Sequence, residues 1–214
     1  MKKSILIIGA GSGLSSGVAE KFGREGFKVS LISRSADNLE RMKKDLETKG
    51  IAVNYSKADA GNAIELRLAI KALETEAGGF DVVLYNAAVV KAFDILEEDP
   101  ATLTKEFAVN VASALASLQA TYEGLKQRKG AFLLTGGGLA VRPAAAYGSL
   151  SIGKAGLRSL AFQLHDRLKN DDIYAGLLTV AGFINPESET HSPELLADLF
   201  WKMYVERSQV ELHQ

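Results

Sequence analysis

Short apolar runs alternate along the chain with longer stretches in which apolar residues recur every three or four positions. The runs have the length of buried strands, and the stretches have the period of helices. This alternation is typical of repeated βαβ units and predicts an α/β fold, a doubly wound parallel sheet of about seven strands flanked by helices. The predicted strands are Ser4–Ile8, Lys28–Ile32, Ile51–Lys57, Val82–Tyr85, Ala131–Thr135, Tyr174–Val180 and Val210–Leu212. The predicted helices are Leu14–Glu25, Asp37–Lys49, Ala63–Ala77, Pro100–Arg128, Ala146–Lys169 and Pro193–Arg207.

The chain of 214 residues shows no linker, repeat or low-complexity tract, so residues 1–214 are expected to form a single domain. A net charge of −1 provides no field to hold a polyanion or an anionic membrane, which argues against nucleic-acid and membrane partners. The absence of cysteine excludes disulfides and thiolate chemistry, and three scattered histidines argue against a metal site. No apolar stretch approaches the length of a membrane span, and no signal-like segment is found, so we expect a cytoplasmic location.

A glycine-rich segment, residues 9–17, lies between the first predicted strand and the first predicted helix. Its pattern is Gly-x-x-x-Gly-x-Gly, with Ser15 in place of the last glycine. Glycines allow positive φ angles and let backbone N–H groups approach a pyrophosphate, and the helix N-terminus adds a partial positive charge. The segment therefore predicts a dinucleotide site. A tight turn without a ligand is the alternative.

The end of the second predicted strand carries Ser33, Arg34 and Ser35, where an NAD-binding protein would have an acid for the ribose 2′-hydroxyl. A guanidinium between two hydroxyls suits a 2′-phosphate, so the sequence favours NADP(H) over NAD(H). A solvated surface arginine is the alternative. Asp59, after the third strand, is placed either to meet the adenine edge or to cap the next helix.

With these features the chain resembles the short-chain dehydrogenase/reductase family, which has a Rossmann-like fold. The resemblance rests on Gly9 and Gly13, Asp59, Tyr85-Asn86-Ala87-Ala88, Asn110, Lys154 and Ala181-Gly182. Together with the loop and Arg34 it implies a set of coenzyme-binding residues: Gly9, Gly11, Ser12, Gly13, Leu14, Ser33, Arg34, Asp59, Ala60, Asn86, Ala87, Ala88, Lys154 and Gly182.

The resemblance implies hydride transfer assisted by Ser, Tyr, Lys and Asn, but the chain departs from that pattern. Leu150 stands four residues before Lys154, where the family has its tyrosine. Tyr147 lies seven residues before Lys154, about 10 Å along a helix axis. Since helical side chains lean toward the N-terminus, we expect Tyr147 to point away from Lys154 unless a distortion at Gly148 or Gly153 shifts the register.

The family's serine is also replaced, because Gly137 occupies its position within Gly136-Gly137-Gly138. The three glycines indicate either close backbone approach to nicotinamide or substrate, or a flexible turn. Thr135 remains as a candidate hydroxyl. Asn110 stands where the family has its relay asparagine and has either that role or a structural one. Lys154, Asn110, Thr135 and Tyr147 are therefore the candidate catalytic residues.

Two functions remain in competition. One is an NADP-dependent oxidoreductase that acts on a carbonyl or alcohol of a small-molecule substrate with an atypical active site. The other is a non-catalytic NADP(H)-binding sensor or scaffold. The resemblance also implies a homodimer or tetramer, formed through the apolar stretches 115–125 and 157–164.

Overall fold

The computed structural model describes residues 2–214 and contains one seven-stranded sheet in which every strand pairing is parallel. The strand order is β3-β2-β1-β4-β5-β6-β7. The strands are β1 (Ser4–Ile8), β2 (Lys28–Ser33), β3 (Val53–Lys57), β4 (Val82–Tyr85), β5 (Ala131–Thr135), β6 (Tyr174–Thr179) and β7 (Glu211–His213). The predicted doubly wound α/β fold is confirmed; β1, β4 and β5 have the predicted bounds, and the ends of the other strands differ by at most two residues.

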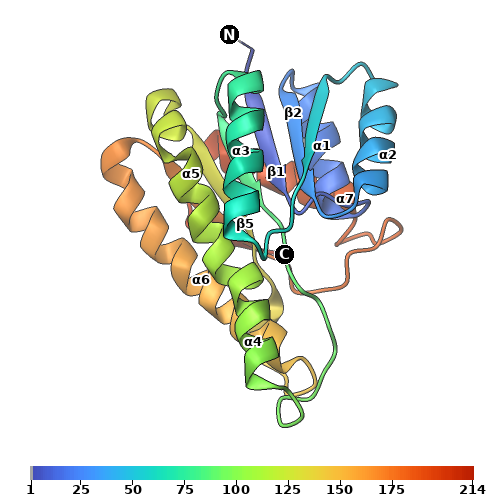
Figure 1. The fold of residues 1–214 in the computed structure, drawn as a ribbon, viewed down its shortest axis with the longest axis vertical. Helices are drawn as coiled ribbons and strands as arrows, with labels where there is room; N and C mark the ends of the chain where they lie inside the picture. The colour runs from blue at the N-terminus through green and yellow to red at the C-terminus, as the bar shows by residue number, and fades with distance from the viewer. Residues whose placement is uncertain (1) are drawn as a thin grey trace.

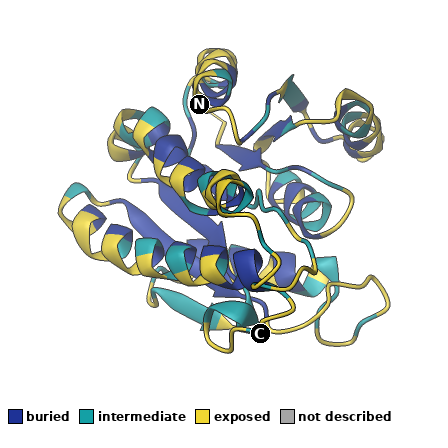
Figure 2. Cartoon of the chain, turned by 60° about the horizontal axis from the view of Figure 1, so that its bottom comes forward, coloured by how far each residue is buried: buried dark blue, intermediate teal, exposed yellow. Residues whose placement is uncertain are grey.

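Helices cover both faces of this sheet, with α3, α5 and α6 ranged along one of them (Figure 1). The α-helices are α1 (Leu14–Arg24), α2 (Ala36–Glu47), α3 (Ala63–Ala77), α4 (Pro100–Phe107), α5 (Ser113–Arg128), α6 (Gly148–Leu168) and α7 (Pro193–Glu206). The helices that pack on the sheet turn a buried stripe toward it and an exposed one outward (Figure 2). No helix within residues 2–214 is both long and apolar enough to span a bilayer.

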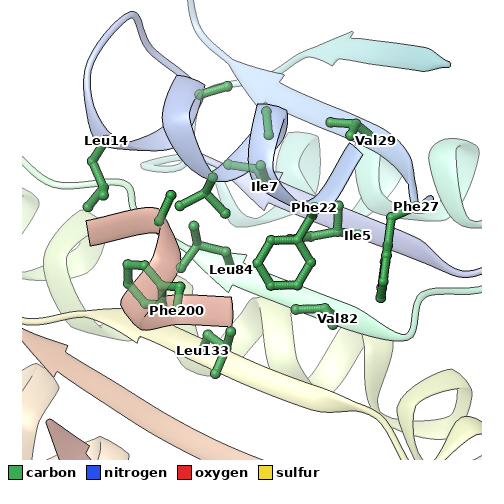
Figure 3. Close-up of a cluster of buried hydrophobic side chains, with 14 of the residues drawn as sticks. Ile5, Ile7, Leu14, Phe22, Phe27, Val29, Val82, Leu84, Leu133 and Phe200 are labelled. Atoms are coloured by element: carbon green, nitrogen blue, oxygen red, sulfur yellow. The ribbon is translucent and has the colours of Figure 1, made fainter. Parts of the chain in front are cut away.

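The strands are apolar because the sheet is buried on both faces. Alternate residues of β1 point to opposite sides, so Ile5 and Ile7 join the core under α1 and α7, whereas Leu6 and Ile8 join the core under α3, α5 and α6. Figure 3 shows the first of these cores, where Phe22 of α1 meets Phe27 edge-on with ring centroids 5.3 Å apart. The continuous apolar runs thus supply side chains to two hydrophobic cores, one on each face of the sheet.

The predicted helix Pro100–Arg128 is wrong in one respect, because it is interrupted by a π-helical turn at Ala108–Ala112. Within this turn, the Val109 carbonyl accepts a hydrogen bond from the Tyr85 hydroxyl. The wider turn directs Asn110 inward, where its Oδ1 accepts a hydrogen bond from the Val89 N–H at 2.8 Å. Such turns often lie at functional sites.

Helices α1 and α7 are in close contact at Gly17. A Cβ added there would lie 2.5 Å from the Pro193 carbonyl oxygen. Gly124 of α5 is a matched contrast, since its Cβ would meet only the carboxylate end of the flexible Glu74 side chain, at 2.8 Å.

We expect Gly17→Ala to lower the free energy of unfolding by about 1 to 3 kcal/mol, because overpacking against backbone exceeds the gain in helix propensity. Gly124→Ala has the same propensity gain and should raise stability by about 0.5 to 1 kcal/mol. Urea unfolding followed by circular dichroism measures both. Equal effects of the two substitutions would contradict the close α1–α7 contact.

Candidate active site

A cleft of about 1150 Å³ runs along the carboxyl ends of β1 to β6. Because the strands are parallel, the segments that follow them converge on this edge. The predicted residues that line it are Gly9, Gly11, Gly13, Leu14, Ser33, Arg34, Asp59, Ala60, Asn86, Ala87, Ala88, Thr135, Tyr147, Lys154 and Gly182. Ser12 and Asn110 are not among the lining residues.

The glycine loop is held close to the end of β4. Gly9 has a φ of +86°, and a Cβ there would clash with the Ala87 backbone nitrogen. The Asn86 side-chain amide donates a hydrogen bond to the Gly9 carbonyl at 3.0 Å. Ser15 closes the loop by accepting the Gly11 N–H at 2.7 Å. A side chain at Gly9 would therefore push the segment after β1 away from the segment after β4.

The first turn of α1 has no side-chain cap and no acidic residue. The N-termini of four other helices, α2, α3, α4 and α7, donate backbone hydrogen bonds to side-chain caps: Ser35, Asn62, Asp99 and Ser192. The unsatisfied N–H groups at the start of a helix attract anions, and Gly13 and Leu14 bring this helix start to the cleft. The loop thus suits a pyrophosphate.

The structure bears on the roles of Asp59 and of the two serines beside Arg34. Asn62, rather than Asp59, caps α3 by accepting the Ile64 and Glu65 N–H groups. Asp59 accepts the Gly61 N–H at 2.8 Å and lines the cleft. Ser35 caps α2 by accepting the Asn38 N–H, so this serine is engaged by the helix, and Ser33 is the hydroxyl beside Arg34 that lines the cleft.

Lys154 of α6 lines the cleft. Its ammonium donates a hydrogen bond to the Thr135 carbonyl at 2.8 Å, and burial lowers its pKa to about 8. The Thr135 hydroxyl oxygen is buried and has no hydrogen-bond partner among the described residues. Gly137 packs on the lysine stem, since a Cβ there would lie 3.4 Å from Lys154 Cε. This spacing is ordinary van der Waals contact, so Gly137 leaves room that a small side chain would fill.

Tyr147 departs from the expected helix. Helix α6 begins at Gly148, and Tyr147 is its non-helical N-cap residue, with φ −132° and ψ 44°. A short bridge to Phe93 and a hydrogen bond from the Gly148 N–H to the Phe93 carbonyl (3.3 Å) fix this segment. Because Tyr147 lies before the helix, the tilt of helical side chains toward the N-terminus does not set its direction. Tyr147 lines the same cleft as Lys154. Leu150, in the first turn of the helix, lines the cleft as an apolar residue.

Asn110 does not line the cleft but contacts two segments that do, α6 and the segment after β4. Its side chain packs directly on Gly153 of α6, where a Cβ would lie 2.6 Å from Asn110 Nδ2. Nδ2 is buried and has no hydrogen-bond partner among the described residues. Through its bond to Val89, Asn110 connects the segment after β4 to α6, which is a structural role.

Several residues that line the cleft were not predicted from the sequence. Val89, Val90, Leu139, Val141, Arg142, Phe183, Ile184 and His213 also line it. All but His213 follow β4, β5 or β6, so the rule that ligands bind at the carboxyl ends of parallel strands could have indicated these segments. It could not indicate which side chains in them face inward.

The fold and the cleft define a parallel α/β protein with a dinucleotide-type loop, and comparison with known proteins identifies the family. The family model described as short chain dehydrogenase matches residues 3–191, and the chain belongs to this family of oxidoreductases. The diacetyl reductase [(S)-acetoin forming] of Staphylococcus epidermidis is 32% identical over 120 residues, which are 56% of this chain and 47% of that protein. The alignment thus spans about half of that relative.

Solved structures show the same fold. A short-chain dehydrogenase/reductase of Serratia marcescens superposes with a TM-score of 0.88 at 20% identity, covering 99% of this chain and 96% of the other. A metagenomic short-chain oxidoreductase in complex with NADP gives a TM-score of 0.89 at 18% identity, covering 100% and 97%.

The buried ammonium of Lys154 leads to a prediction about stability. Its pKa is about 8 in the folded protein against an ordinary value of 10.5, so the unfolded chain binds more protons between these values and stability rises with pH across that window. Below pH 8 the folded protein bears the cost of the buried charge.

Lys154→Met keeps the apolar stem, removes the charge and loses one hydrogen bond. We expect this variant to be more stable than the parent protein by about 1 to 2 kcal/mol at pH 7, without ligands, and to lose this advantage as the pH approaches about 10.5. Urea unfolding of both proteins across that range is the measurement. A difference that stays constant with pH would show that the ammonium is not desolvated.

Proposed function

We propose that the protein is an NADP(H)-dependent oxidoreductase that interconverts a carbonyl and an alcohol in a small-molecule substrate. The observation that carries this proposal is the continuity of the cleft, which joins the glycine loop and Arg34 at one end to Lys154 and Tyr147 farther along. A dinucleotide along this line would bring its reactive end next to the two residues that can hold or move a proton.

The residues present fit such a coenzyme. The approach of Gly9 to Ala87 leaves a bare backbone surface, and the uncapped start of α1 provides N–H donors for the pyrophosphate. Arg34 is exposed at the cleft and would pair with a 2′-phosphate, while Asp59 offers an acceptor for the adenine. The NADP bound to the metagenomic relative supports this choice of coenzyme.

The side chains of the protein would position the coenzyme and substrate and transfer a proton. A bound reduced nicotinamide supplies a hydride. Lys154, fixed to the Thr135 carbonyl, would hold the ribose and place its positive charge in the cleft. Tyr147 is the phenol that lines the cleft and would donate a proton to the substrate oxygen during reduction. Leu150 and Gly137 shape the wall where the family has its tyrosine and serine.

A non-catalytic NADP(H)-binding protein is the second candidate. It is favoured by one observation, that Leu150 is 5% exposed and offers no proton at the family's tyrosine position. Under this alternative, Lys154 and Arg34 hold the coenzyme, and Tyr147 has no part in a reaction.

The surface of α5 and α6 supports self-association. Leu115, Ile152 and Phe162 are exposed large apolar side chains on these two helices. We therefore propose a homodimer or tetramer formed through them.

For Arg34→Asp we expect NADPH binding to weaken by about 10- to 100-fold, since a charge-assisted pair with the 2′-phosphate becomes a repulsion, while NADH binding changes little. Titration of coenzyme fluorescence measures both. Arg67→Asp is the control, because Arg67 is exposed on α3 and is not among the cleft-lining residues. Equal weakening of NADPH and NADH by the Arg34 variant would show that Arg34 does not contact the phosphate.

Tyr147→Phe removes a single hydroxyl from the cleft. We expect kcat for carbonyl reduction to fall by about 10²- to 10⁴-fold, the usual contribution of a general acid, with NADPH affinity retained. NADPH oxidation with a panel of aldehydes and ketones is the measurement. If the parent protein binds NADPH but oxidises it with no carbonyl of the panel, the non-catalytic candidate is correct. If the variant turns over like the parent, the proton comes from another group.

A further inference from the structure

The cleft beyond Lys154 differs in chemistry from the coenzyme end. Its walls carry large apolar side chains that are open to the cleft: Val90 is 72% exposed, Val141 54% and Phe183 88%. Leu150 and the side-chain-free Gly137 continue this surface toward Lys154. Polyhydroxylated substrates need several hydrogen-bonding partners, and the apolar walls supply none.

Charge is distributed unevenly along the same cleft. Asp59 is the one carboxylate among the lining residues of the described chain, and it lies after β3, at the coenzyme end. The far end has Arg142, which follows the short 3-10 helix Gly138–Ala140 after β5. The Arg142 N–H donates to the Gly138 carbonyl at 2.9 Å, which fixes the backbone at this point.

The guanidinium of Arg142 forms no hydrogen bond or ion pair with another residue in 2–214. Three carboxylates with buried side chains are paired with other cations: Glu98 and Glu106 both contact Lys91, and Glu211 binds Arg158 at 2.7 Å. A cation that lines the cleft beside apolar side chains, without a hydrogen-bond or ion-pair partner among residues 2–214, suits a ligand that brings its own negative charge.

We propose that the substrate site accepts a carbonyl compound with an apolar body and a carboxylate, and that Arg142 binds the carboxylate. This inference rests on the proposed function, because it places the reacting carbonyl near Tyr147 and Lys154. Val90, Val141 and Phe183 cover the apolar body, and Arg142 sets the preference for an acid over a neutral molecule of the same shape.

Three probes test this assignment. 4′-Acetylbiphenyl-4-carboxylate and 4′-acetylbiphenyl-4-carboxamide have the same size and differ in charge, and erythrulose is a ketone rich in hydroxyl groups. Their dissociation constants are measured by saturation-transfer NMR in the presence of NADP⁺, where no ketone reduction occurs. KM values from NADPH oxidation provide a second measurement. The proteins compared are the parent, Arg142→Gln, Arg142→Lys and, as a control outside the cleft, Arg67→Gln.

We expect the carboxylate to bind about 10-fold more tightly than the carboxamide at low ionic strength, and this ratio to shrink in about 0.5 M salt. Arg142→Gln should bring the ratio close to one, Arg142→Lys should retain part of it, and Arg67→Gln should leave it unchanged. Erythrulose should show no binding. A ratio of one in the parent protein, a ratio that Arg142→Gln does not alter, or tight binding of erythrulose would overturn the inference.

Coenzyme binding, measured separately by fluorescence, distinguishes the two proposals. If NADPH binds and the carboxylate has no advantage, the assignment of Arg142 is wrong and the proposed oxidoreductase function stands. If NADPH does not bind but the carboxylate preference depends on Arg142, the proposed function is wrong and an anion-selective apolar site remains.

Discussion

The parallel hydrogen bonding of the sheet is the constraint on which the site depends. Each strand pairs in register with its neighbour, as Ile8 does with Ile32 and with Tyr85, so the strand ends lie level with one another. Parallel strands require a crossover between them, and the crossovers here are helices that bury both faces. Backbone N–H and C=O groups inside the sheet are then paired with one another. They become available to a ligand only where the strands end. The cleft forms at the carboxyl ends of the strands because the loops that line it begin there.

Close packing at two glycines shapes the cleft at the carboxyl ends of the strands. Gly9 lies against Ala87 and Gly153 against Asn110, and at both points a side chain would have to displace its neighbour. The first contact brings the glycine loop to the end of β4, and the second brings α6 to the π-helical turn. A hydrogen bond from the Asn86 side chain to the Gly9 carbonyl reinforces the first contact, and one from the Val89 N–H fixes the Asn110 side chain that makes the second. The glycines and asparagines thus set the distances between elements.

Lys154 illustrates how this packing controls chemistry. A lysine on the exposed side of a helix would keep its ordinary pKa, whereas desolvation lowers the pKa of Lys154 to about 8. Its single hydrogen bond to the Thr135 carbonyl holds the ammonium at the cleft wall. The protein therefore keeps a positive charge at some cost in stability, which is typical of a residue retained for a ligand rather than for folding.

The order and type of the elements, the glycine loop and the positions of Arg34 and Lys154 could be predicted from the amino-acid sequence. These features depend on local periodicity and on the short-range geometry of a strand, a turn and a helix. Only the tertiary structure decided that Tyr147 precedes α6 and lines the cleft, because a bridge to Phe93, more than fifty residues away, fixes the start of that helix. The tertiary structure also accounts for the interruption at Ala108–Ala112, since it involves a hydrogen bond from Tyr85, a residue on another strand, which periodicity does not encode.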